Sequence, residues 1–204
     1  MTLIVATQNA GKVREFKRIL DPLGIIVLSL ADIELNVDVE ETGSTFAENA
    51  KIKAQTIMQL CALPAIADDS GLCVDALGGA PGVYSARYAG EGASDDQRIN
   101  KLLSELKNVP DEKRTAHFVS SICCSFPSGD EITAEGTCEG KIGYEKRGEN
   151  GFGYDPVFIT EHGSFSEITA EQKDEISHRG KALREFYEKL KEFKENRGND
   201  IVNE

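Results

Sequence analysis

The sequence lacks the features that mark nucleic-acid-binding and membrane proteins. Its 204 residues carry a net charge of −12 at pH 7, and no basic block exceeds a few residues. Most of the surface would therefore repel duplex DNA and anionic membranes. No apolar run approaches the ~20 residues that a membrane-spanning helix needs. The sequence predicts a protein with no nucleic-acid partner and no membrane association.

The sequence also lacks the cysteine and histidine spacings of a disulfide framework or a zinc site. Its five cysteines are odd in number, and no C-x-x-C, H-x-x-H or H-E-x-x-H spacing occurs. We therefore expect a reduced, cytoplasmic protein. Internal repeats, low-complexity tracts and interdomain linkers are absent too. We expect one domain over residues 1–195 and a frayed tail over 196–204.

A loop with glycine and lysine links the first predicted strand, residues 3–6, to a helical stripe that starts at Lys12. Free backbone N–H groups and the positive end of the helix face the same space in such a loop, which suits it to bind anions. The Walker signature is absent because Val13 follows Lys12. The loop is therefore either an unusual phosphate-binding loop or an ordinary strand-to-helix turn.

An acidic connection containing Glu41 leads into a helix that begins at Thr45. The residues at 45–48 match the capping-box pattern. One face of this helix is polar because four polar residues lie three or four positions apart, namely Thr45, Asn49, Lys53 and Thr56. Such a stripe is usually only solvated. Here it comes directly before a pair of aspartates, which favours a site of carboxylates and lysine.

That pair, Asp68-Asp69, stands where the apolar run 63–67 gives way to Ser70-Gly71. We expect a short buried strand that ends here, since α/β proteins place functional side chains at strand ends. Neighbouring side chains on a strand point to opposite faces, so one aspartate is expected to face a site and the other to brace the loop. Taken alone, Asp-Asp-Ser-Gly is also ordinary turn chemistry.

The second half of the chain has β character followed by a glycine-rich aromatic loop. Strands are expected over 117–126 and 131–142, joined by the turn signal at 127–130. Two glycines flank Phe152, which lets backbone and ring approach a flat ligand; alternatively, this is a glycine turn entering a strand at 156–159. Further on, Ser177 is expected to cap the last helix beside a cluster of basic side chains.

Together these motifs resemble the Ham1/RdgB family of purine nucleoside triphosphate pyrophosphatases, also called inosine triphosphatases. The resemblance spans Thr7 to Lys181. It implies an elongated α/β fold of two lobes, with a central mixed β-sheet flanked by helices and a cleft between the lobes. It also implies Mg²⁺ dependence, a homodimer, and hydrolysis of ITP, dITP and XTP to the monophosphate and pyrophosphate. Such an enzyme clears deaminated purines from the nucleotide pool.

The resemblance also implies residue roles. It assigns catalysis to Asp69, Asp68 and Lys53, and metal binding to Glu41 and Asp69, whose hard oxygens suit magnesium. Nucleotide binding is implied for Thr7, Gln8, Asn9, Ala10, Gly11, Lys12, Ser70, Arg87, Phe152, Gly153, Tyr154, Asp155, Lys173, His178 and Arg179. Gln8 stands where the family often has glycine, and we expect its side chain to narrow the triphosphate loop.

The basic side chains near the last helix are suited to bind the purine rings of these nucleotides. Hypoxanthine and xanthine carry an acceptor at C6 where adenine carries a donor, so a pocket of donors would reject ATP. On this interpretation an Arg179→Ala variant loses most activity toward ITP and keeps its fold.

Three other functions remain open from the sequence. The first is a Maf-type pyrophosphatase that prefers pyrimidine or modified nucleotides, which the Ser177-His178-Arg179 and Phe152–Asp155 motifs disfavour. The second is a phosphatase that releases orthophosphate. The third is a non-catalytic nucleotide sensor, which would not need to keep a water-activating carboxylate such as Asp69.

Overall fold

A mixed seven-stranded β-sheet forms the centre of the computed structural model, which describes residues 1–200 and the side-chain surroundings of residues 1–196. The strands lie in the order β2-β1-β3-β4-β5-β6-β7. β1 pairs in parallel with β2 and β3, and the other neighbours are antiparallel. The strands are β1 Thr2–Val5, β2 Ile26–Ser29, β3 Ala65–Val74, β4 Thr115–Ser125, β5 Glu131–Ile142, β6 Phe158–Thr160 and β7 Gly163–Ser164.

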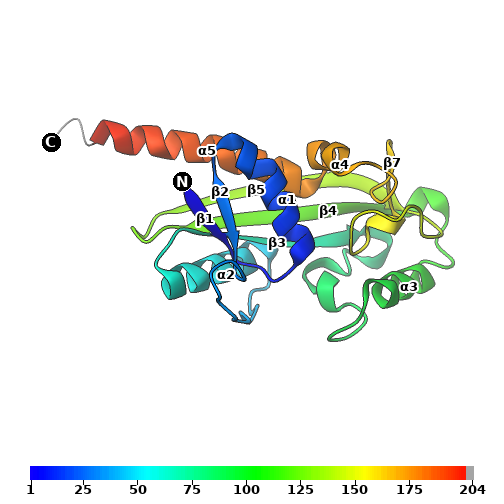
Figure 1. Cartoon of the computed structure of the whole chain (residues 1–204). Coiled ribbons are helices and arrows are strands. Elements are labelled where there is room, and N and C mark those ends of the chain that lie inside the picture. Colours follow the sequence, from blue (N-terminus) through cyan, green and yellow to red (C-terminus); the bar gives the residue numbers. More distant parts are fainter. Residues whose placement is uncertain (201–204) are drawn as a thin grey trace.

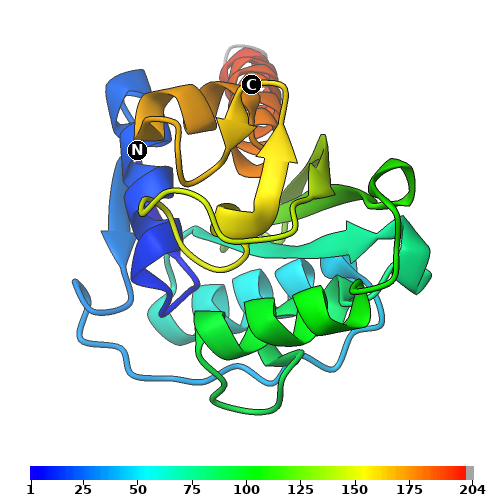
Figure 2. The ribbon, with the colours of Figure 1, turned by 90° about the vertical axis from the view of Figure 1, so that its right-hand side faces the viewer.

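Helices cover both faces of this sheet, which confirms the expected mixed α/β fold (Figure 1). They are α1 Ala10–Leu20, α2 Phe46–Cys61, α3 Asp95–Glu105, α4 Ala170–Ile176 and α5 His178–Asp200. In Figure 2, α1, α4 and α5 lie on one side of the sheet and α2 and α3 on the other. Short 3₁₀ turns, among them η3 Gly82–Arg87, connect several elements.

Side chains along β1 point alternately to the two faces of the sheet, which explains why a layer of helices packs on each face. Leu3 and Val5 join a core cluster with α1 and α5, whereas Ile4 joins one with α2. Successive strand residues point to opposite faces, so this short buried strand holds a helix on each side. A third cluster includes Ile99 and Leu102 of α3 and Phe158, and Figure 1 shows α3 toward the other end of the elongated molecule.

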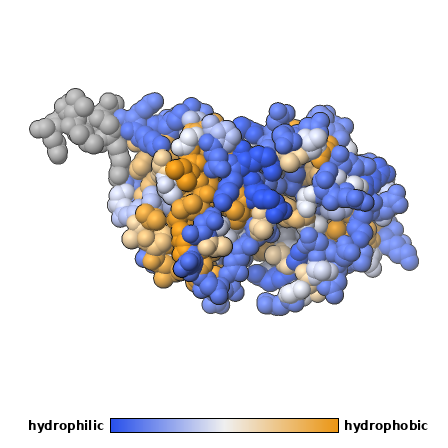
Figure 3. Space-filling model, viewed as in Figure 1, coloured by the Kyte–Doolittle hydropathy of each residue, from blue (hydrophilic) through white to orange (hydrophobic). Residues whose placement is uncertain are grey.

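β2 forms one edge of the sheet and leaves apolar surface exposed. Ile26 on this strand is 58% exposed. Figure 3 shows apolar residues gathered over the part of the molecule that carries β1 and β2, beside an otherwise largely hydrophilic face. In the described part of the chain, no helix combines the length and apolar character that crossing a membrane would take.

Several local predictions agree with the structure. The capping box at the start of α2 is present, because Glu48 N donates to Thr45 Oγ1 and Thr45 N to Glu48 Oε2, each at 3.1 Å. β5 has the predicted bounds, and β4 lies within two residues of the prediction. Ser177 caps α5 as predicted, since its Oγ accepts the N–H of Gly180 at 3.1 Å.

The predicted end of the strand before the aspartate pair is wrong. β3 continues to Val74, so Asp68 and Asp69 lie inside the strand, paired with Ile122 and Ser121 of β4. Gly71 does not make a turn. A Cβ atom there would lie 2.4 Å from the carbonyl oxygen of Gly82, so glycine lets the η3 segment approach the sheet.

Three further boundaries differ from the predictions. α4, which the sequence analysis did not separate from the last helix, begins with a capping box between Thr169 and Gln172. The strand expected at 156–159 begins at Phe158, because Pro156 belongs to a 3₁₀ turn. α5 continues past residue 196 to Asp200, and 201–204 of the predicted tail lie outside the described residues.

Candidate active site

The loop between β1 and α1 brings a lysine to the middle of the sheet. α1 begins at Ala10, and Asn9 caps it by accepting the N–H of Lys12 at 3.1 Å. Thr7 Oγ1 in turn accepts the N–H of Asn9 at 3.2 Å. Lys12 therefore lies in the first turn of the helix, from which its Nζ reaches Asp68 Oδ2 at 2.8 Å.

Asp68 is buried among cations. Besides Lys12, Arg179 Nη2 contacts its Oδ2 at 2.9 Å, and Ser120 Oγ donates to its Oδ1. Burial alone would raise the pKa of Asp68, but Arg179 and Lys12 outweigh burial and hold this pKa well below its ordinary value. Asp68 is thus an ionised carboxylate whose oxygens are both engaged by protein groups.

Asp69 points to the opposite face of β3, toward α2. Lys53 Nζ lies 2.9 Å from its Oδ1, and Asn49 Nδ2 donates to its Oδ2 at 3.3 Å. Burial raises the pKa of Asp69 despite the nearby ammonium of Lys53. The two aspartates face opposite sides of the strand, as predicted: Asp68 is enclosed by buried cations, and Asp69 meets the polar stripe of α2.

Lys53 joins the two carboxylates that were predicted to bind metal. Its Nζ lies 2.7 Å from Glu41 Oε1 and 2.9 Å from Asp69 Oδ1, and it donates to the Asp68 carbonyl at 3.1 Å. Arg87 Nη1 approaches Glu41 Oε2 at 3.7 Å. Among the described residues, no group of three or more acidic, His or Cys side chains is arranged to hold a metal. Two converging carboxylates suit Mg²⁺, which commonly adds phosphate oxygens and waters to one or two carboxylates.

A second part of the site is a pocket of about 110 Å³ beside Lys12. Lys173 Nζ lies 2.6 Å from Asp155 Oδ2 and 4.7 Å from the centre of the Phe152 ring. Asp155 also accepts the N–H of Phe152 at 2.9 Å, which fixes the loop. The predicted residues that line this pocket are Asn9, Lys12, Ser70, Phe152, Gly153, Tyr154, Asp155, Lys173, His178 and Arg179.

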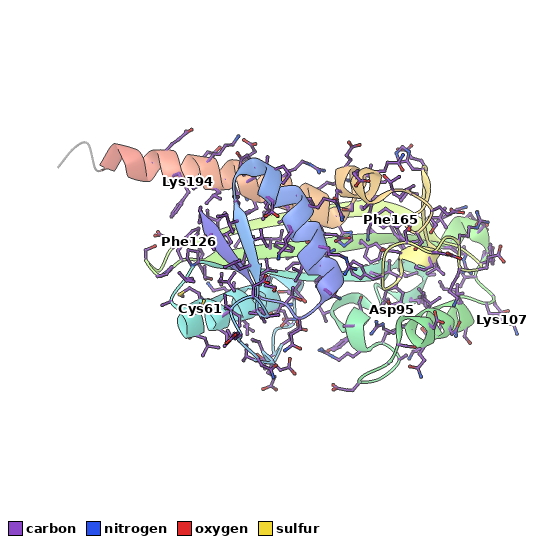
Figure 4. All side chains as sticks on the ribbon, in the orientation of Figure 1. Cys61, Asp95, Lys107, Phe126, Phe165 and Lys194 are labelled. Carbon is purple, nitrogen blue, oxygen red and sulfur yellow. The ribbon has the colours of Figure 1, made fainter. Side chains whose placement is uncertain are left out.

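Residues at the far end of the molecule support this pocket. Asp95 and Phe165, labelled in Figure 4, lie toward the same end of the molecule, near α3 and β7. Asp95 Oδ2 accepts the N–H of Gly153 at 2.7 Å, and Phe165 stacks on Phe118 with ring centres 6.0 Å apart. These contacts hold the aromatic loop against the body of the protein.

His178 is a buried histidine with a free ring nitrogen. Its ring stacks on Phe118 at 4.6 Å with an 11° angle between planes, and its Nδ1 has no hydrogen-bond partner within the part of the chain that the structure describes. Burial, reinforced by the neighbouring guanidinium of Arg179, holds the pKa of His178 well below its ordinary value. The ring is therefore neutral and lines the pocket with one unused polar atom.

Glu15 of α1 is a site residue that the sequence analysis missed. It is buried, pairs with Lys173 Nζ at 2.9 Å, and also contacts Arg179 Nη1. Burial alone would raise the pKa of Glu15, but Arg179 and Lys173 hold it at about 2. The sequence does hold one signal for Glu15: it lies three residues after Lys12, and residues i and i+3 share a helix face.

A second cavity, which holds several of the residues expected to bind phosphate, adjoins the pocket. It measures about 270 Å³ and is lined by Thr7, Gln8, Asn9, Lys12, Glu41 and Lys53 among others; it shares Asn9 and Lys12 with the pocket. Five predicted site residues line neither of these cavities, namely Ala10, Gly11, Asp68, Asp69 and Arg87. Ala10 lines a third hollow, between α1 and residues 29–36, which shares Thr7 and Gln8 with the second cavity. Gly11 packs under Phe152, where a Cβ atom would lie 2.6 Å from the ring.

The fold and much of the sequence are similar to those of known proteins. A profile of the Ham1 family matches residues 3–189. The dITP/XTP pyrophosphatase of Bacillus subtilis is 51% identical over 185 residues, covering 90% of this chain and 93% of that protein. The dITP/XTP pyrophosphatase of Bacillus cereus is 48% identical over 195 residues, covering 94% and 95%.

Solved structures agree with these comparisons. The Ham1 protein of Staphylococcus aureus superposes with a TM-score of 0.82 at 42% identity, covering 94% of this chain and 98% of that one. A HAM1 protein of Coxiella burnetii gives 0.83 at 41% identity, covering 94% and 99%.

Proposed function

The chain belongs to the Ham1 family, and from this premise we propose that it hydrolyses dITP, ITP and XTP to the nucleoside monophosphate and pyrophosphate. The observation that carries the proposal is the near-complete match, at about half identity, to proteins named dITP/XTP pyrophosphatase. The two adjoining cavities support it, because one offers lysines and carboxylates and the other a buried set of donors. The protein would be a hydrolase of phosphoric anhydrides that cleanses the nucleotide pool.

The triphosphate is proposed to bind in the cavity between the β1–α1 loop and α2. Lys12 and Lys53 would neutralise phosphate oxygens as pyrophosphate leaves, which is stabilisation of developing charge by fixed donors. Thr7 and Asn9 hold the loop in shape through the hydrogen bonds described above. Mg²⁺, when bound by Glu41 and Asp69, would supply further charge neutralisation on the triphosphate.

Asp69 is the proposed general base for the attacking water. Both oxygens of Asp68 are already engaged by Lys12, Arg179 and Ser120, so that residue is better suited to fix the two cations. Among the described residues, Asp69 Oδ2 has only the long hydrogen bond from Asn49, at 3.3 Å. A carboxylate with a spare lone pair beside the phosphate cavity can orient and deprotonate water.

The purine ring of the nucleotide is proposed to lie in the pocket against Phe152. Lys173 and the neutral His178 offer donors toward the C6 oxygen of hypoxanthine or xanthine, and Glu15 and Asp155 hold Lys173 in place. Adenine would bring an amino group to the same donors and leave them unpaired in a buried site. This argument supports the preference for deaminated purines.

A nucleotide panel tests the function. With Mg²⁺ present, ITP, dITP and XTP should be hydrolysed with a kcat/KM at least about 100-fold above that of ATP, because unpaired buried donors discriminate strongly. Pyrophosphate and orthophosphate would be detected separately. Orthophosphate as the product would indicate a phosphatase, turnover chiefly of dTTP a Maf-type specificity, and binding of ITP without turnover a sensor.

A second prediction concerns the proposed metal site. Glu41→Gln should raise the Mg²⁺ concentration for half-maximal velocity about tenfold or more, because one of the two carboxylates loses its charge. Velocity against Mg²⁺ concentration at saturating ITP measures the shift. Glu40→Gln is the matched control, since Glu40 is the exposed neighbour with no ion pair in the described structure. An equal shift in both variants would contradict the assignment of Glu41.

A homodimer and a cytoplasmic location stay proposals that follow from the family. The apolar surface over β1 and β2 in Figure 3 would suit burial in a subunit interface. Light scattering coupled to size exclusion would measure the mass in solution.

A further inference from the structure

Residues 36–43 form an extended segment, here called the strap, that carries Glu41 into the site. The strap contains no helix or strand. Exposure alternates along it: Val37, Val39 and Glu41 are half-buried, whereas Asp38 and Glu40 are exposed. This period of two is that of an extended chain, in which alternate side chains share one face. Glu41 faces inward only in this register.

The main chain of the strap is held at few points. At its ends, Leu35 N donates to Leu30 O at 2.9 Å, and Gly43 N donates to Asn49 Oδ1 at 2.8 Å. Across 36–42, all of which the structure describes, a single hydrogen bond involves the main chain. Its donor is Gln8 Nε2 and its acceptor is Val37 O, at 2.9 Å.

We propose that Gln8 is a positioning residue that fixes the register of the strap and thereby the place of Glu41. The Val37 carbonyl lies four residues before Glu41, within the same alternating run. A slip of one residue would turn Glu41 outward and bring Glu40 or Thr42 to the inner face. The inference rests on the proposed function in one respect, the assignment of Glu41 to the metal.

Other contacts at Glu41 do not replace this hydrogen bond. Lys53 and Arg87 act on the Glu41 side chain, and Val37 and Val39 add apolar contact without directional preference. Only the hydrogen bond from Gln8 selects one main-chain position in 36–42. Gln8 also belongs to the loop between β1 and α1, so it ties the strap to the segment that carries Asn9 and Lys12.

Gln8→Ala should raise the Mg²⁺ concentration for half-maximal velocity about two- to tenfold, the range that one net hydrogen bond changes an equilibrium. The loss of velocity should be smaller at saturating Mg²⁺ than at low Mg²⁺, since bound metal then holds Glu41 in the correct register. Gln59→Ala is the matched control, because Gln59 is an exposed glutamine on α2 whose side chain makes no hydrogen bond in the described structure. A fall in kcat with an unchanged metal curve would overturn the inference and indicate direct contact of Gln8 with the substrate.

Cleavage by a glutamate-specific protease gives a readout independent of activity. Without nucleotide or metal, Gln8→Ala should be cut after Glu40 or Glu41 about two- to tenfold faster than the unaltered protein, because release of one hydrogen bond frees the strap. Gln59→Ala should be cut at the original rate. Equal rates in all three proteins would refute the role of Gln8, whether or not the protein hydrolyses ITP.

A double variant tests whether Gln8 acts through Glu41. In a Glu41→Gln background, Gln8→Ala should no longer shift the metal curve, because the group that it positions is gone. Its effect on proteolysis should persist. An undiminished metal shift in this background would show that Gln8 acts by another route. If the unaltered protein fails to hydrolyse any nucleotide of the panel, the proposed function fails, and the proteolysis result still decides the role of Gln8.

Discussion

Asp69→Asn is expected to lower kcat/KM for ITP by about 10²–10⁴-fold, the range that a general base contributes. Asparagine has nearly the same shape but can neither accept a proton at neutral pH nor offer the same charge to a metal. Lys53 keeps Glu41 as its partner at 2.7 Å, so the change in the free energy of unfolding should be about 1 kcal/mol or less. Steady-state kinetics and urea unfolding measure the two quantities.

The neighbouring aspartate supplies the matched control. Asp68→Asn should destabilise the protein by about 3–5 kcal/mol, because the substitution removes the carboxylate charge that pairs with the buried cations of Lys12 and Arg179. The two variants differ by one position on the same strand, yet one should lose catalysis and the other stability. A stable, inactive Asp68→Asn beside an active Asp69→Asn would reverse the assigned roles.

Arg179→Ala is expected to lose both activity toward ITP and stability. The structure revises the sequence-based expectation that this variant keeps its fold, because Arg179 is fully buried between Glu15 and Asp68. Its removal would leave two buried carboxylates without a shared cation, which costs about 3–5 kcal/mol. Chemical denaturation measures this loss, and kcat/KM is measured under conditions where the variant remains folded.

Two further variants separate the specific role of Arg179 in the site from the general effect of losing a buried arginine. Arg179→Lys keeps a cation but not the fork that spans Glu15, Asp68 and Ser70. It should fold, and its kcat/KM for ITP should fall. Arg114→Ala removes another fully buried arginine, whose guanidinium donates only to backbone carbonyls, so its folded form should keep full activity. Unchanged kinetics in a folded Arg179→Lys would contradict a role for Arg179 in the site.

Features that depend on neighbours in the chain could be predicted from the sequence. The capping box at Thr45 and the shared face of Asn49 and Lys53 follow from spacing within one helix, and both agree with the structure. The bounds of β5 follow from alternation and a turn signal. In each case, the decisive interactions lie within a few residues of sequence.

Features that depend on distant partners could not be predicted in this way. β3 continues through Asp68 and Asp69 because β4, some fifty residues later, pairs with it along its whole length. Glu15 is buried on a helix face because Arg179, 164 residues away, neutralises it. Nothing near Glu15 in the sequence reveals that partner. The resemblance to a family named candidate site residues, but not these supporting contacts.

The position of the aspartate pair inside β3 links the assembly of the site to folding. The pairing of β3 with β4 decides which carboxylate meets Lys12 and which meets Lys53. If β3 paired with an offset of one residue, one aspartate would take the place of the other beside its cations, and the remaining aspartate would have no cation partner. A misregistered intermediate would therefore bury uncompensated charge and be driven back toward the unfolded chain. The charges proposed for catalysis would thus also oppose misregistered strand pairing during folding.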